Sequence, residues 1–139
     1  ITVRAGDFAL FIRAAQEWPA ASVYAPLMAD GNGVNLNVPL MTLAFVPLTW
    51  LPPWAAITLW SAINVACMIG AWWLLAREGF AWELVALGLM VPMTGPLSLL
   101  LGQVTGLLLL ASVGAWLASR HGRPSLCGAL IGLLIAVKP

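Results

Sequence analysis

The sequence predicts an all-α integral membrane protein. It is 62% hydrophobic and only 8% charged, whereas a soluble domain is about half apolar and about a quarter charged. Its apolar runs lack the alternating polar residues that a membrane β-barrel needs. The net charge is +1 and no basic block is present, so no nucleic-acid partner is expected. We expect about four transmembrane helices plus juxtamembrane helices, embedded in the lipid bilayer.

The first 35 residues are the most polar part of the chain, and we interpret residues 1–35 as an extracytoplasmic loop. One stretch, residues 7–18, has apolar residues three and four positions apart, which is the spacing of one helix face; these are Phe8, Phe11, Ile12 and Ala15. Arg13 and Glu17 fall on the opposite face, and Pro19 ends the stretch. The pattern predicts a short amphipathic helix resting at the membrane interface.

Residues 36–139 form the predicted transmembrane region, and its first segment, 36–51, is too short for a full crossing. Pro39 and Pro47 interrupt this segment, which favours a juxtamembrane or re-entrant helix. Three tryptophans surround the following proline pair and predict an aromatic belt at the interface; they are Trp50, Trp54 and Trp60.

Four later segments are predicted to cross the membrane: 54–76, 82–100, 103–119 and 125–139. The first is free of charge over its whole length and would reach about 34 Å as a helix, enough for a tilted crossing. The last two enclose a short basic turn and read as a hairpin. Two Gly-x-x-x-Gly pairs allow close helix packing inside the bundle; they are Gly102/Gly106 and Gly128/Gly132.

Charged residues divide between the two ends of these helices. Arg77, Arg120 and Arg123 fall in the two shortest loops, so the positive-inside rule places that end in the cytosol. Asp7, Gln103 and Lys138 then share the extracytoplasmic end, and the protein is predicted to be a multi-pass plasma-membrane protein. The chain begins at Ile1 and its last apolar run is short, so we expect further helices at both ends.

The polar residues at the extracytoplasmic end are the candidates for chemistry. A carboxylate there, such as Asp7, can take a proton from a sugar hydroxyl, and cations such as Arg13 and Lys138 can hold a phosphate. The alternative is purely structural: Asp7 would be an acid favoured by a helix N-terminus, and Lys138 would snorkel. No Cys/His cluster, phosphate loop or Ser–His–Asp set occurs, so no metal or cofactor is expected.

The remaining polar residues have simpler interpretations. His121 reads as a solvated loop residue, and Glu78 and Glu83 as counter-charges for Arg77. The two cysteines, Cys67 and Cys127, fall inside apolar runs and read as packing residues.

The order of short motifs resembles glycosyltransferase family 87, the polyprenyl-phosphate-mannose-dependent transferases of the GT-C superfamily. The matching motifs are Gly6-Asp7-Phe8, Ala14-Ala15, Val23-Tyr24-Ala25-Pro26, Asn37-Val38-Pro39-Leu40, Pro47-Leu48, Leu59-Trp60 with Asn64, Gly102-Gln103, and Gly122-Arg123-Pro124 followed by Gly128, Gly132 and Lys138-Pro139. The resemblance extends over nearly the whole chain, and its specificity lies in the order and spacing of the motifs.

The resemblance implies a GT-C-like helical bundle that moves a sugar, expected to be mannose, from a polyprenyl-phosphate donor to a glycolipid or glycan hydroxyl. An acidic residue in the first extracytoplasmic loop is the catalytic base of that superfamily, and Asp7 matches it. Juxtamembrane helices build the lipid-donor groove. The expected substrate-binding residues are Arg13, Tyr24, Gln103 and Lys138.

Two other classes of protein fit the same composition. A transporter would use broken helices to enclose a site at mid-membrane, but no charged residue lies in the middle of a predicted span, where such sites usually have one. A non-catalytic membrane fragment is the third interpretation. Sugar transfer measured with and without Asp7 separates all three.

Overall fold

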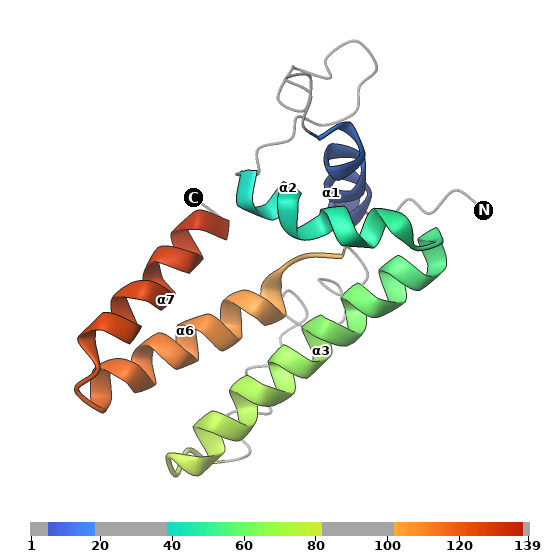
Figure 1. Cartoon of the computed structure of the whole chain (residues 1–139). Coiled ribbons are helices and arrows are strands. Elements are labelled where there is room, and N and C mark those ends of the chain that lie inside the picture. The colour runs from blue at the N-terminus through green and yellow to red at the C-terminus, as the bar shows by residue number, and fades with distance from the viewer. Residues whose placement is uncertain (1–5, 19–38, 82–101, 138–139) are drawn as a thin grey trace.

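A computed structural model describes residues 6–18, 39–81 and 102–137 of the chain (Figure 1). All regular structure within these residues is helical, which confirms the predicted all-α class. The helices are α1 (Gly6–Glu17), α2 (Pro39–Phe45), the 3₁₀ helix η2 (Val46–Trp50), α3 (Pro53–Arg77), α6 (Thr105–Arg120) and α7 (Pro124–Val137). The crossing predicted over 82–100 lies outside the described residues.

The long helix α3 forms one side of the molecule, and α6 and α7 make a hairpin beside it (Figure 1). Its 25 residues give a length of about 37 Å. In the described part of the chain, α3 alone is long and apolar enough to cross a membrane. The helices α6 and α7 are apolar but have only 16 and 14 residues. The number of crossings therefore stays a prediction.

The helices α3 and α6 run in the same direction. Two hydrogen bonds join them, from Trp60 to Gly102 and from Gly106 to Asn64, and both link residues 42 positions apart. A constant offset of this kind is possible only between segments that run parallel. The end of α3 and the beginning of α6 therefore lie at opposite ends of the bundle.

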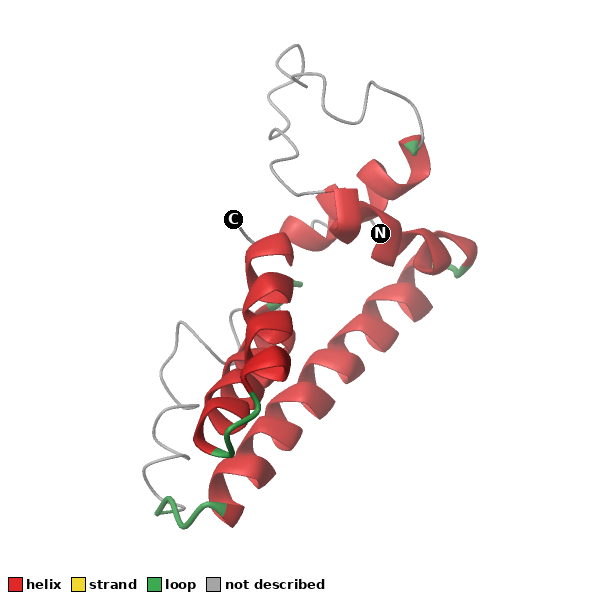
Figure 2. Ribbon diagram, turned by 60° about the vertical axis from the view of Figure 1, so that its left-hand side comes forward, coloured by secondary structure: helices red, strands yellow, loops and turns green. Residues whose placement is uncertain are grey.

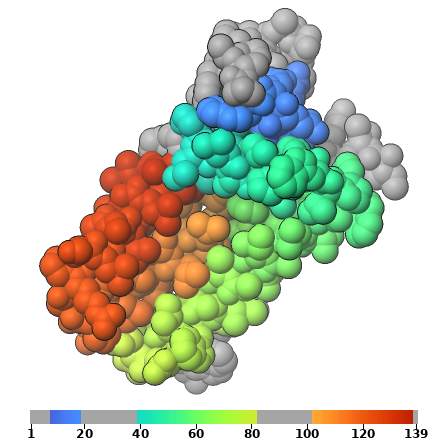
Figure 3. Space-filling view, viewed as in Figure 1, coloured from blue at the N-terminus to red at the C-terminus, as the bar shows by residue number. Residues whose placement is uncertain are grey.

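The short helices α1 and α2 cover the end of the bundle where α3 and α6 begin and α7 finishes (Figures 2 and 3). Phe45, which is fully buried, is the centre of this end. Its ring lies 4.7 Å from that of Phe11, 4.5 Å from that of Trp60 and 5.9 Å from that of Phe8, measured between centroids. Val104 and Val137 join the same core. The core therefore gathers segments from the whole length of the chain at one end.

The predicted helix over residues 7–18 is present as α1, but its apolar face packs against protein. Phe8, Phe11 and Ala15 are buried in the core with Phe45 and Leu48, whereas the prediction laid this face on the membrane interface. Ring packing on Phe45 of α2 and the nearby Leu48 of η2 give these side chains partners that the sequence spacing alone does not reveal.

The segment predicted as one helix over 36–51 divides into α2 and η2. The second half of the segment is the 3₁₀ helix η2. Pro47 lies in the first turn of η2, where the missing N–H of proline is tolerated. The predicted aromatic belt is wrong for Trp60, which is 6% exposed; Trp50 and Trp54 are 80% and 71% exposed, and their place at a membrane interface stays a prediction. The Trp60 ring packs against Phe45 in the core, and its indole N–H finds an acceptor in the carbonyl oxygen of Gly102.

The two Gly-x-x-x-Gly pairs differ in their packing. A Cβ at Gly102 or at Gly106 would collide with Phe8 or with the Asn64 backbone, respectively, so this pair permits close approach as predicted. For Gly128 and Gly132 the predicted close packing is not seen among the described residues, where a Cβ at either position would have nothing within 4 Å. In the α6–α7 hairpin the close contact is made by Gly114, whose added Cβ would lie 3.2 Å from Leu130.

Candidate active site

The turn that starts α6 is held in place by two side chains of α3. The indole Nε1 of Trp60 donates to the carbonyl oxygen of Gly102 at 2.9 Å. One helical turn further along, the amide Oδ1 of Asn64 accepts the backbone N–H of Gly106 at 3.1 Å. Both side chains are buried. The position of residues 102–106 is thus fixed by polar contacts in an otherwise apolar interface.

Asn64 acts as a cap for a helix to which it does not belong. The residue before α6, Val104, has no polar side chain to accept the free N–H groups of the first turn. Asn64 supplies the missing acceptor from α3, and its own Nδ2 donates to the Trp60 carbonyl at 3.1 Å. Its oxygen and nitrogen are therefore both used, which explains how an amide is tolerated at 1% exposure.

The same turn contacts the start of α1. Gly102 has a φ of +69°, a conformation that glycine adopts freely and other residues rarely do. It lies so close to Phe8 that an added Cβ would come within 3.3 Å of the Phe8 backbone. Gln103 and Asp7 each lie one residue from this contact. The structure therefore brings the Gly-Gln motif to the beginning of the helix that carries Asp7.

A groove of about 610 Å³ runs beside α1. One wall is α1, and the other is η2 with the beginning of α3. The lining residues are Phe8, Ala9, Ile12, Arg13, Gln16 and Glu17 from α1, with Leu48, Thr49, Leu51, Pro53 and Ala56 opposite. Most of these side chains are apolar, and the charged ones all belong to the second half of α1. The groove therefore has a mostly apolar lining, with its charged side chains at one edge.

Arg13 is the one cation among the described residues that line this groove, and it forms an ion pair within its own helix. Its Nε lies 3.4 Å from Oε1 of Glu17, one turn further along, and the two side chains are 42% and 33% exposed. An exposed pair of this type contributes about 0.2–1 kcal/mol. Glu17 therefore holds the guanidinium only weakly, and Arg13 can also contact a phosphate group in the groove.

The structure describes some of the predicted site residues and not others. Arg13 lines the groove, Gln103 is half-buried in the turn beside Phe8, and Asp7 lies in the first turn of α1, with its side chain outside the described part. Tyr24 and Lys138 both lie outside the described residues. Lys138 directly follows Val137, which packs in the same core as Phe8 and Val104.

Trp60 and Asn64 are the residues whose position in the site the sequence interpretation missed. A signal for Asn64 was present, because it is an amide in the middle of a charge-free run, and polar side chains in apolar helices usually bond to a neighbouring helix. Trp60 gave no such signal, since its place near two prolines and two other tryptophans is typical of an interface belt.

At the opposite end of the bundle, the predicted pairing of Glu78 with Arg77 is wrong. Glu78 does not balance Arg77; it pairs with Arg120 at 3.6 Å and approaches His121 at 3.9 Å. Arg77 instead stacks over the ring of Trp73 at 4.7 Å. Glu83 lies outside the described residues. Glu78 therefore links the end of α3 to the end of α6.

A comparison with protein-family models matches residues 35–139 to glycosyltransferase family 87. The match begins just before α2 and contains Trp60, Asn64, Gly102 and Gln103, the residues of the turn described above. The chain belongs to glycosyltransferase family 87. It is therefore a glycosyltransferase sequence, of a family whose members are membrane proteins. A comparison with curated proteins found no match, and a comparison with solved structures also found none.

Proposed function

We propose that this chain is part of a multi-pass membrane glycosyltransferase of the GT-C type. It transfers a sugar, with mannose as our first choice, from a polyprenyl phosphate to a hydroxyl of a glycolipid or glycan. The observation that carries this proposal is the groove beside α1, which has an apolar length for an isoprenoid chain and Arg13 at its edge for the phosphate.

The membrane setting is supported by the apolar side chains that the helices leave exposed. On α3, Ile69 and Trp73 are 58% and 57% exposed, and Ile135 on α7 is 62% exposed. Exposed apolar surface of this extent marks contact with a membrane or another protein. With α3 as a crossing, the basic end at Arg77, Arg120 and Arg123 lies in the cytosol, and the groove lies at the extracytoplasmic face.

The proposed reaction is a single displacement with inversion at the anomeric carbon. The Asp7 carboxylate takes the proton of the acceptor hydroxyl while the hydroxyl oxygen attacks the anomeric carbon. The bond from the anomeric carbon to the phosphate oxygen breaks, and its electron pair leaves with the polyprenyl phosphate. Phosphate is a good leaving group, so cationic contacts from Arg13 and Lys138 suffice to hold it. Gln103 and Tyr24 are assigned to substrate contacts.

The proposal is tested on the purified protein with a synthetic polyprenyl-phosphate mannose. Asp7→Asn should lower turnover by about 10²- to 10⁴-fold, the usual contribution of positioned proton transfer, while donor binding is retained. Lys138→Ala should instead weaken donor binding. The matched control is Asp30→Asn, which removes a carboxylate from a glycine-rich stretch of the same loop and should retain turnover. Normal turnover in Asp7→Asn would exclude Asp7 as the base.

A further inference from the structure

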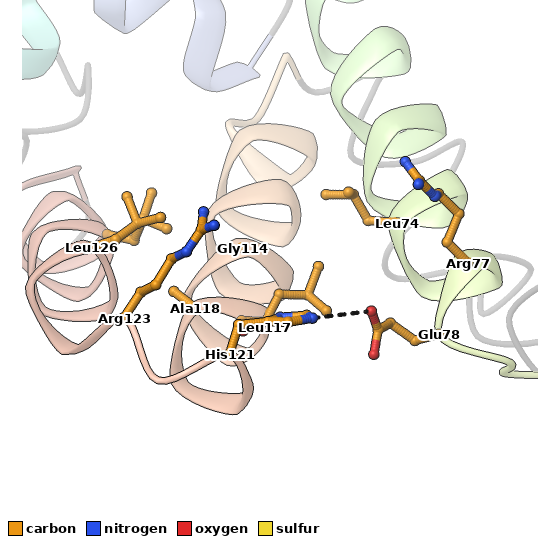
Figure 4. A pocket seen from close by; sticks show the side chains of 10 residues that line it. Leu74, Arg77, Glu78, Gly114, Leu117, Ala118, His121, Arg123 and Leu126 are labelled. Carbon is orange, nitrogen blue, oxygen red and sulfur yellow. Dashed lines mark hydrogen bonds and ion pairs between the residues drawn. The ribbon is translucent and has the colours of Figure 1, made fainter.

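A second pocket lies at the end of the bundle opposite the groove. It has a volume of about 510 Å³ and is enclosed by the last turns of α3 and α6 and the first turns of α7 (Figure 4). Its lining residues are Leu74, Arg77, Glu78, Gly114, Leu117, Ala118, His121, Arg123, Leu126 and Leu130. This pocket and the groove beside α1 therefore lie at opposite ends of the described helices.

The charges at this pocket leave a surplus of positive charge. Glu78, its one lining carboxylate among the described residues, is paired with Arg120. Figure 4 shows the His121 ring directed across the gap from α6 to the same carboxylate. Among the described residues, Arg77 has the neutral ring of Trp73 as its partner, and no carboxylate of these segments lies within ion-pair distance of Arg77 or Arg123. Two guanidinium groups are therefore available to an anion.

The rest of the pocket wall is apolar. Four leucines contribute from all three helices: Leu74, Leu117, Leu126 and Leu130. A free phosphate ion has no group that complements such a wall, because it is charged on every side. A ligand that fits both parts has a phosphate at one end and a hydrocarbon chain at the other.

We propose that this pocket binds an anionic phospholipid of the cytosolic leaflet, with its phosphate at Arg77 and Arg123 and an acyl chain along the leucines. The inference rests on the proposed membrane orientation and is independent of the glycosyl transfer. In that orientation the ends of α3 and α6 and the start of α7 lie at headgroup depth, where basic pockets between helices recognise anionic lipids. The ligand occupies the opposite leaflet from the sugar donor.

Fluorescence quenching tests the proposal, because Trp73 and Trp116 stack on Arg77 and Arg120 at this end of the bundle. The purified protein is placed in phosphatidylcholine nanodiscs that contain an equal fraction of brominated phosphatidylglycerol or of brominated phosphatidylcholine. Phosphatidylglycerol should quench more strongly. Arg123→Gln and Arg77→Gln should each weaken its apparent affinity about fivefold, which corresponds to about 1 kcal/mol for one basic residue near the lipid surface.

The matched control is Arg4→Gln, which removes the same charge from the predicted extracytoplasmic segment 1–35 and should leave the preference unchanged. Equal quenching by the two lipids would overturn the proposal, as would an equal loss in Arg4→Gln, since that indicates a general charge effect. Displacement of phosphatidylglycerol by inorganic phosphate at similar concentration would assign the pocket to a free anion and also overturn it. Labelling of a single cysteine at position 122 from outside the cell would reject the membrane orientation, and this inference with it.

Discussion

The capping of α6 by Asn64 makes a quantitative prediction. In Asn64→Leu the volume changes little, but the Gly106 N–H loses its acceptor in an apolar interface. A buried donor left without a partner costs about 1–3 kcal/mol. We therefore expect the free energy of unfolding to fall by about 2 kcal/mol, roughly a thirtyfold change in the unfolding equilibrium.

The assay is reversible unfolding in mixed micelles titrated with dodecyl sulfate, followed by tryptophan fluorescence. Thr58→Val is the control, because the Thr58 hydroxyl donates only to the Trp54 carbonyl of its own helix, and it should change stability by less than about 0.5 kcal/mol. A double-mutant comparison with Gly106→Ala provides a second test. Its new Cβ would collide with the Asn64 backbone, so α6 must move away, and Asn64→Leu should then cost less than it does alone. If Asn64→Leu were as stable as the control, or if the two changes were simply additive, the capping argument would be refuted.

Three further predictions concern the turn at 102, the core and the topology. Gly102→Ala should destabilise the protein more than Gly122→Ala in the same unfolding assay. Both glycines have positive φ, +69° and +66°, but of the two only Gly102 has a described neighbour that the new Cβ would meet. Equal losses of stability would contradict the close contact with α1. Thr42→Val should raise the free energy of unfolding by about 1 kcal/mol, since the buried Thr42 hydroxyl forms no hydrogen bond with the described residues; a loss of stability would indicate a partner for it. Single cysteines at positions 122 and 31, in a cysteine-free background, should label from the cytosol and from outside respectively; labelling from one side only would refute the proposed orientation.

Elements whose side chains repeat with a clear period could be predicted from the sequence. The apolar face of α1 follows from Phe8, Phe11 and Ala15 at spacings of three and four. The helix α3 follows from a long run without charge. In both cases the signal is local, because it depends only on residues within a few turns of each other.

Contacts between distant segments could not be predicted in the same way. Glu78 precedes Arg120 by more than forty residues, and the pair forms only because α3 and α6 end at the same level. The burial of Trp60 likewise depends on a carbonyl oxygen at Gly102. At the candidate site, the sequence correctly grouped Gln103 with the helix of Asp7, because helix lengths alone fix which ends coincide. It could not indicate that Gly102 and Phe8 touch.

The cap that α3 gives to α6 also bears on how the protein is made. A ribosome delivers Asn64 to the membrane before Gly106, so the acceptor oxygen is already in place when the first turn of α6 emerges. The N–H of Gly106 therefore need not wait in hydrocarbon without a partner, a situation that costs several kcal/mol. In a rearranged gene that encodes α6 ahead of α3, the same helix would enter the bilayer uncapped. The order of the two helices along the chain thus places the acceptor in the membrane ahead of the donor that it caps.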